Sequence, residues 1–97
     1  MNIEQEETGN TGRFYVKENN ITLAEMLYTK YGANILLVTH TEVDESLEGK
    51  GIGKLLVAAA VEYARNNSFI IMATCPFAKK VLERTKEYAD VYTAYQH

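Results

Sequence analysis

The chain has 97 residues and suits a single domain, because half of it would be too short to build a second core. Apolar residues make up 46% and charged residues 24%, a composition that excludes disordered, collagen-like and low-complexity chains. The 10 basic residues against 13 acidic ones give a net charge of −3, which argues against a nucleic-acid partner but not against a small anionic ligand.

The sequence also predicts the compartment and the partners. Apolar runs such as residues 55–61 are too short to span a bilayer, and the acidic start lacks the apolar stretch of a signal peptide. The single cysteine, Cys75, has no partner for an internal disulfide, which favours a reducing cytoplasm. No His and Cys residues have zinc spacing, and no heptad seam stands out. We therefore expect a cytoplasmic monomer with no membrane, nucleic-acid or metal partner.

The N-terminal half alternates between strand patterns and turns. Residues 1–11 carry three glutamates and are expected to be a flexible acidic tail or a poorly held edge, so the domain is assigned to residues 12–97. Aromatic, apolar and β-branched residues then predict three strands joined by turns that contain Asn or Gly. The strands cover 14–17, 22–31 and 35–43, and the turns cover 18–20 and 32–34.

The C-terminal half predicts two helices around one more strand. Apolar residues recur at helical spacing from Ile52, and the asparagines at 66–67 are expected to end that helix. A buried strand over 69–73 follows, and Pro76 suits the first position of a helix that reaches about residue 86. Residues 91, 92 and 95 predict a last strand or loop. Because a helical crossover makes its two strands parallel, the fold class is α+β: antiparallel N-terminal hairpins, a strand–loop–helix–strand unit and a C-terminal helix around a mixed sheet of four or five strands.

Half of the six glycines lie in one loop that opens the clearest helix. Gly49, Gly51 and Gly53 alternate with Lys50 and Ile52, and Lys54 follows them. Glycine lets the backbone approach an anion closely, and the free N–H groups at a helix start favour negative charge. The loop therefore predicts a phosphate cradle of main-chain amides, with Lys50 or Lys54 adding charge. The alternative is a tight strand-to-helix turn without a ligand.

Two well-known phosphate loops do not fit these residues. A Walker loop needs glycine five positions before its Gly-Lys pair and a hydroxyl residue after it, but Gly53-Lys54 has Glu48 and Leu55 at those places. A dinucleotide fingerprint needs a third glycine where Lys54 or Leu56 stands. The predicted phosphate cradle is therefore of another kind.

A helix opened by Gly51 and Gly53 after a buried strand resembles the acetyl-CoA pyrophosphate loop of the GNAT N-acetyltransferase superfamily. That loop has glutamine or arginine three residues before the first of these glycines, whereas this chain has Glu48, which puts like charge near phosphate. Four segments narrow the resemblance to a subfamily of very small GNAT-like proteins. They are His40-Thr41-Glu42-Val43, residues 49–53, Glu62-Tyr63-Ala64-Arg65 and Cys75-Pro76-Phe77.

The resemblance spans about residues 13–92 and implies a minimal GNAT-like fold. It also implies acetyl-CoA as co-substrate and transfer of the acetyl group to an amine, on a small molecule or a protein. The implied cofactor-binding residues are Val43, Gly49, Lys50, Gly51, Ile52, Gly53 and Lys54. The subfamily's His-Pro-Glu-Tyr run reads Thr85-Lys86-Glu87-Tyr88 here, so only Glu87 and Tyr88 match, and Tyr88 is the candidate acid for the CoA thiolate.

Three side chains are candidates for catalysis. His40 and Glu42 end the first central strand and, being two residues apart, point the same way, so they form a candidate general base. Cys75 precedes the second helix, where a thiol gains thiolate character, and it is expected to face the same cleft as His40 and to act as a transient acetyl acceptor. The alternatives are a structural histidine, a solvated acid and a small buried hydrophobic residue.

Two other functions remain open at this point. One is an acetyl-CoA or CoA-binding module without turnover, acting as a sensor or carrier, which Glu48 and the missing His-Pro pair favour. The other is an interaction domain whose glycine loop is only a turn. For the acetyltransferase, the resemblance implies that the N-terminal helices walling the acceptor side are missing from so short a chain, so we expect an open acceptor groove.

Overall fold

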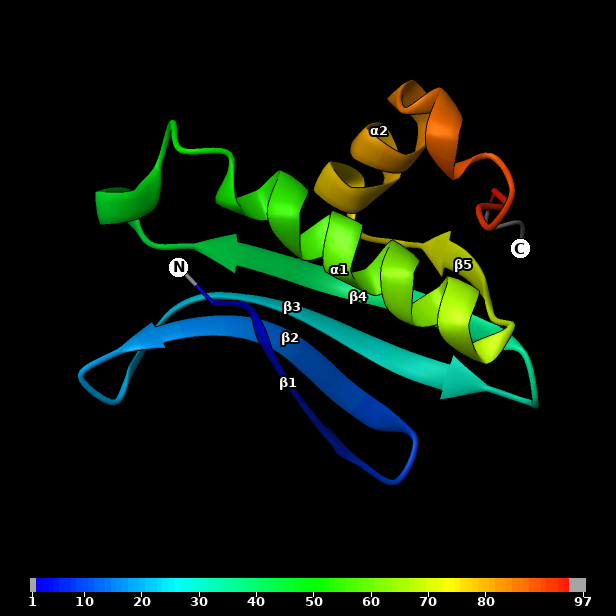
Figure 1. Ribbon diagram of the computed structural model, residues 1–97, viewed down its shortest axis with the longest axis horizontal. Coiled ribbons are helices and arrows are strands. Elements are labelled where there is room, and N and C mark those ends of the chain that lie inside the picture. The colour runs from blue at the N-terminus through cyan, green and yellow to red at the C-terminus, as the bar shows by residue number, and fades with distance from the viewer. Residues whose placement is uncertain (1, 95–97) are drawn as a thin grey trace.

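The computed structural model describes residues 2–94 and shows one five-stranded sheet with two α-helices on one of its faces (Figure 1). The strands are β1 Glu4–Thr8, β2 Thr11–Glu18, β3 Ile21–Tyr31, β4 Ile35–Val43 and β5 Ile70–Ala73; the helices are α1 Ile52–Asn67 and α2 Pro76–Arg84. The strand order follows the chain, with antiparallel pairing from β1 to β4 and parallel pairing of β4 with β5. The predicted fold class is confirmed.

The core lies between the sheet and α1. Helix residues Leu56, Ala60 and Ala64 are almost fully buried against strand residues such as Met26 and Leu36. The apolar stripe is turned slightly from the predicted one, because Leu55 is exposed. The helix ends at Asn67, as expected, but the left-handed cap is Ser68, with a φ of 61°, and not one of the asparagines. Asn19 and Asn20 adopt positive φ in the β2–β3 turn, as the sequence predicts.

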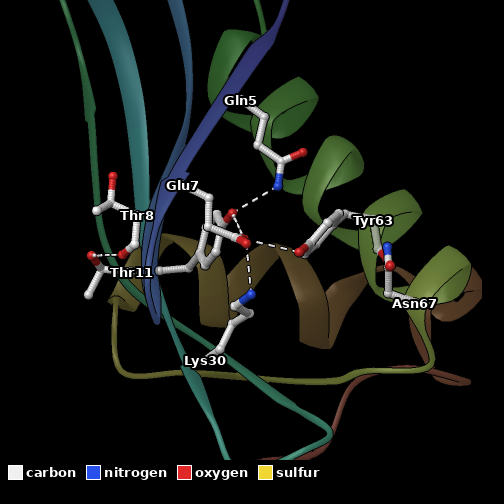
Figure 2. Close-up of polar contacts among 8 residues, drawn as sticks. Gln5, Glu7, Thr8, Thr11, Lys30, Tyr63 and Asn67 are labelled. Atoms are coloured by element: carbon white, nitrogen blue, oxygen red, sulfur yellow. Dashed lines mark hydrogen bonds and ion pairs between the residues drawn. The ribbon is translucent and has the colours of Figure 1, made fainter.

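Residues 4–8 form β1, a strand at the edge of the sheet. Of the two expectations for the N-terminus, these residues match the poorly held edge and not the flexible tail. Although β1 is exposed, Glu7 ties it to its neighbours (Figure 2). Lys30 Nζ, Tyr28 Oη and Tyr63 Oη donate to this carboxylate at 2.7, 2.6 and 3.0 Å. The hydrogen bonds from Lys30 and Tyr28 hold the pKa of Glu7 below its usual value. Gln5 adds a 2.8 Å bond from its amide to Tyr28 Oη.

The sheet face opposite the helices carries no helix from the described residues, and we call it the open face. The Arg13 guanidinium lies 4.0 Å from the centroid of the Tyr15 ring on this face. Arg13 Nε and Nη1 also bind Glu6 and Glu25 at 2.6 and 2.9 Å. Tyr15 is consequently buried although no helix packs over it.

The chain after α2 folds back along β5. A 3₁₀ helix spans Lys86–Tyr88, and Arg65 of α1 binds Asp90 at 2.8 Å. Ile71 N donates to Val91 O, and Thr93 N donates to Ile71 O, so this segment adds a short parallel bridge to β5. The expectation of a last strand or loop therefore holds up to residue 93, whereas Tyr95 lies outside the described residues. Neither helix among residues 2–94 has the length and apolar content needed to cross a membrane.

Candidate functional site

The two parallel strands β4 and β5 separate after a short stretch of pairing. They pair from Ile35 with Ile70 to Val38 with Ala73, and Thr74 N and Cys75 N then both approach Val38 O, at 3.0 and 3.4 Å. Beyond Val38, β4 continues to Val43 with no backbone hydrogen bond to β5 among residues 2–94. The edge of β4 that faces β5 is therefore available to an extended ligand over residues 39–43.

The connection after β4 is held in place at three points. Asp44 N donates to Leu23 O at 2.7 Å, and the Asp44 carboxylate accepts from Ser46 N and Ser46 Oγ at 3.0 and 2.6 Å. The bonds from Ser46 lower the pKa of Asp44. Leu47, in a 3₁₀ helix over Glu45–Leu47, is buried in the core. These contacts fix the start of the glycine loop relative to the strands.

The glycine loop presents free backbone amides. Gly49 and Gly51 have φ values of 80° and 72°, and Gly51 is the N-cap of α1. Lys50 N donates to Leu47 O at 3.3 Å, and the first helical bond is Leu55 N to Gly51 O at 3.1 Å. Within residues 2–94, the amides of Gly49, Gly51, Ile52, Gly53 and Lys54 have no acceptor. A left-handed residue before a helix start makes a concave set of N–H groups that favours an anion.

The glycines of this loop have different roles. A Cβ at Gly49 or Gly51 would have nothing within 4 Å, so the positive φ rather than crowding requires glycine there. A Cβ at Gly53 would lie 2.6 Å from the Phe77 ring, so this glycine lets α2 pack against α1. The Ile52 side chain is buried in the core and anchors the helix start. Lys50 and Lys54 are exposed, and so is Glu48.

A β-bulge decides which side chains of β4 reach which face. Tyr28 pairs with Val38 and Leu27 pairs with His40, so Thr39 is an extra residue on β4. Residues paired across neighbouring strands project to the same face. Thr41 therefore projects with Met26 toward the helices, whereas His40 projects with Leu27 to the open face.

The expectation that Cys75 and His40 face the same cleft is wrong, and the bulge is the reason. Without the bulge at Thr39, regular alternation from Val38 would have turned His40 toward the helices. Cys75 belongs to the core on the helix side, is 5% exposed, and donates its thiol to Thr41 Oγ1 at 3.3 Å. His40 and Glu42 do share one face, as predicted, and both are exposed. Thr41 could not be predicted to meet Cys75, because nothing local to Thr41 in the sequence marks the bulge.

An acidic cavity of about 460 Å³ lies at the ends of β3 and β4. Glu42 contributes to it together with Glu25, its direct partner across the strands. Asp44 and Glu45 complete the acidic lining, and Val43 contributes apolar surface. Two carboxylates directly opposite each other repel, so this cavity suits a cationic group. The place of Glu25 in this cavity depends on its pairing with Glu42, which the local sequence does not show.

Tyr88 lies in the segment that follows α2. Arg65, in the last turns of α1, donates to the backbone carbonyl of the neighbouring Glu87. Tyr88 is half-buried and packs against the core, and its backbone carbonyl accepts from Val91 N at 3.1 Å. Its role as the acid for the CoA thiolate stays a prediction.

Comparisons with known proteins agree on one family. The family model described as GCN5-related N-acetyl-transferase matches residues 13–91. A GCN5-like candidate N-acetyltransferase from Staphylococcus aureus, solved by NMR, is 40% identical with a TM-score of 0.72, and the match covers 97% of this chain and 91% of that one. No curated protein matches.

More distant structures share the fold. A ribosomal-protein-alanine N-acetyltransferase from Brucella melitensis biovar Abortus 2308 has a TM-score of 0.66 at 16% identity, over 91% of this chain and 65% of that one. An aminoglycoside N-acetyltransferase in complex with CoA has a TM-score of 0.63 at 12% identity, over 99% of both chains. At these identities the likeness concerns the fold alone.

Proposed function

Because the chain belongs to the GCN5-related N-acetyltransferase family, we propose that it binds acetyl-CoA and transfers the acetyl group to an amine. The observation that carries this proposal is the set of free amides at Gly49 and at residues 51–54, in the loop that follows the unpaired edge of β4. The diphosphate of CoA binds the amides of Gly49, Gly51 and Ile52, with Lys50 or Lys54 nearby. The amide groups of the pantetheine arm then hydrogen-bond to β4 over residues 39–43, beside Val43.

The two sides of the strand split supply different parts of the reaction. The amine approaches from the open face, where His40 or Glu42 accepts its proton. The amine nitrogen forms a bond to the acetyl carbon, and the carbon–sulfur bond of the thioester breaks. The CoA sulfur leaves with the electron pair toward the helix side, where the Thr41 hydroxyl, which accepts from the Cys75 thiol, donates a hydrogen bond to it. A backbone N–H of β4 polarises the thioester carbonyl.

The acidic cavity supports an amine as the acceptor. An amine is protonated in solution, so it is attracted to Glu25 and Glu42 before it reacts. Glu25 already forms an ion pair with Arg13. Glu42, in contrast, forms no ion pair within residues 2–94. Glu42 is therefore the carboxylate that we assign to the incoming ammonium group.

A second candidate function is an acetyl-CoA carrier or sensor without turnover. Two observations favour it: Glu48 stands exposed beside the amides, and His40 lies on the other face from Cys75. The carrier uses the same amides but needs no base. The two functions therefore share the binding site and differ in the role of His40 and Glu42.

Release of free CoA from acetyl-CoA, measured with a panel of primary amines, tests the transferase. We expect amine-dependent release, and His40→Gln or Glu42→Gln should lower the rate by about 10²–10⁴ for the residue that acts as base. Glu62→Gln on the exposed side of α1 is the matched control and should keep full activity. If acetyl-CoA binds but no amine accelerates release over buffer, the carrier is the correct function.

Cys75 offers a covalent route that a separate experiment distinguishes. In that route the acetyl group moves from the CoA sulfur to the Cys75 thiol, and then to the amine. Mass spectrometry after brief mixing with acetyl-CoA would then find one acetyl group on Cys75, lost on adding amine. Cys75→Ser with full turnover would eliminate this route and leave direct transfer to the amine.

A further inference from the structure

Three hollows lie along the open face or at its margin. The first, of about 260 Å³, is apolar and is lined by Tyr31, Ile35, Leu37 and Met72 over β3, β4 and β5. A second, of about 360 Å³, lies over β1, β2 and β3 around Arg13 and Leu27. The third is the acidic cavity of about 460 Å³. The side of the molecule without helices therefore offers an apolar hollow and an acidic cavity at separate places.

The two halves of the open face differ in how much apolar surface they leave uncovered. Over β1, β2 and β3, the Arg13 side chain lies on Tyr15 and is held by Glu6 and Glu25, so the chain covers its own apolar surface. Over β4 and β5, the apolar hollow has no charged residue in its lining, and Tyr31 is 53% exposed. An apolar hollow beside exposed aromatic surface is typical of a docking site.

Charge identifies the kind of partner. The apolar hollow and the acidic cavity lie toward opposite ends of β4, with Leu37 and Glu42 about 16 Å apart along the strand. Glu42, Asp44 and Glu45 form no ion pair within residues 2–94. A partner that complements both places carries a cationic group and an apolar side chain at this separation. In an extended peptide this distance corresponds to roughly five residues.

We infer that the open face docks an extended protein segment, with an apolar side chain in the Tyr31–Leu37–Met72 hollow and a basic residue at Glu42. The inference rests on the proposed function and names the acceptor class: an amine carried by a polypeptide. A free small amine would use the acidic cavity and leave the apolar hollow empty. A second copy of the chain would bring the same carboxylates face to face, which charge repulsion disfavours.

NMR titration of the isotope-labelled protein tests the docking directly. The probe is a synthetic peptide with lysine and leucine five residues apart in a neutral sequence. One control peptide replaces the lysine with glutamate, a second replaces the leucine with serine, and butylamine stands for a small amine. We expect shifts at Leu37, Met72 and Glu42 with the probe, and affinity about tenfold weaker or worse for each control.

A pair of variants supplies the matched control on the protein. Tyr31 and Ile21 stand at the two ends of β3 and are 53% and 62% exposed, so lysine at either place is tolerated by the fold. Tyr31→Lys puts a charge into the apolar hollow and should weaken probe binding about tenfold or more. Ile21→Lys lies outside all three hollows and should leave binding unchanged. Equal effects of the two variants would overturn the inference.

The remaining outcomes separate this inference from the proposed function. If acetyl-CoA shifts the Gly49–Lys54 amides, and butylamine is acetylated as well as the probe with no shift at Leu37, the inference fails and the proposed function stands. If the probe shifts Leu37 and acetyl-CoA shifts nothing, the docking stands and the transferase fails. A dimer in sedimentation that Tyr31→Lys dissociates would show a second copy on this face and would overturn the inference.

Discussion

The glycine loop and the open face lie on the two sides of one strand and have opposite electrical character. At the loop, the groups that we propose to bind acetyl-CoA are backbone N–H donors with Lys50 and Lys54 beside them. On the open face, near the end of β4, the groups that we propose to bind the amine are carboxylates, Glu25 and Glu42. Strand β4 therefore separates a side with free hydrogen-bond donors from a side with acidic acceptors. The bulge at Thr39 decides which face each later side chain of β4 reaches: Thr41 projects toward the helices, and His40 projects to the open face.

Gly51→Asp should have the strongest effect, and it should weaken binding at the glycine loop without changing the open face. A carboxylate beside the free amides repels phosphate, so we expect acetyl-CoA to bind about 100-fold more weakly by calorimetry. Gly32→Asp is the matched control, because Gly32 also has positive φ, at 58°, with nothing within 4 Å of a Cβ. Weakening by both variants would mean that general strain, and not the anion site, is responsible.

Gly53→Ala separates packing from ligand binding within the loop. The new Cβ would overlap the Phe77 ring, which is 40% exposed. The free energy of unfolding should therefore fall by about 1–3 kcal/mol, as measured in denaturant melts. Phe77→Ala removes the obstacle, and the double variant should recover part of the loss. If Gly53→Ala were no less stable than the original chain, the contact between α1 and α2 would be looser than described.

Glu48→Gln removes a negative charge from the glycine loop and so increases its contrast with the acidic open face. Removing a negative charge next to the diphosphate should tighten acetyl-CoA binding by about threefold to tenfold, with less gain at high salt. Glu62→Gln changes the net charge equally, away from the loop, and should have little effect. Unchanged affinity in Glu48→Gln would indicate that the Glu48 carboxylate turns away from the bound phosphate.

The smallest expected effect concerns the edge strand that borders the open face. The pKa of Glu7 is lowered in the folded chain, so its stabilisation is present above about pH 4.5 and is lost as pH falls through the folded pKa. Because Glu7 is partly open to solvent, Glu7→Gln should cost only about 0.5–1 kcal/mol near pH 7. In denaturant melts this difference should shrink as the pH falls below 4.5, and a pH-independent difference would contradict the charge effect.

The parts that could be predicted from the sequence are those set by local chemistry. Asn19 and Asn20 at positive φ, Pro76 at the helix start and the glycine loop all follow from conformational preferences of single residues. The fold class followed from apolar periodicity together with a family resemblance. These features depend on neighbours in the sequence, so they can be read without knowing the tertiary contacts.

The features that were missed depend on contacts between distant residues. The bulge at Thr39 exists only in the register between β3 and β4, so the wrong side was assigned to His40 relative to Cys75. The edge strand depends on Glu7 meeting residues far along the chain. The segment before Tyr88 is held by Arg65, twenty-two residues away from Glu87 in the sequence.

Titration of the isotope-labelled protein with acetyl-CoA, followed by NMR, tests whether the glycine loop binds the diphosphate. We predict that the amides of Gly49, Gly51, Ile52 and Lys54 shift together and saturably, and that residues 39–43 shift with them. Residues on the open face, such as Tyr31, should stay unchanged. Saturating acetyl-CoA without a shift in the Gly49–Lys54 amides, or with shifts confined to the open face, would contradict the account.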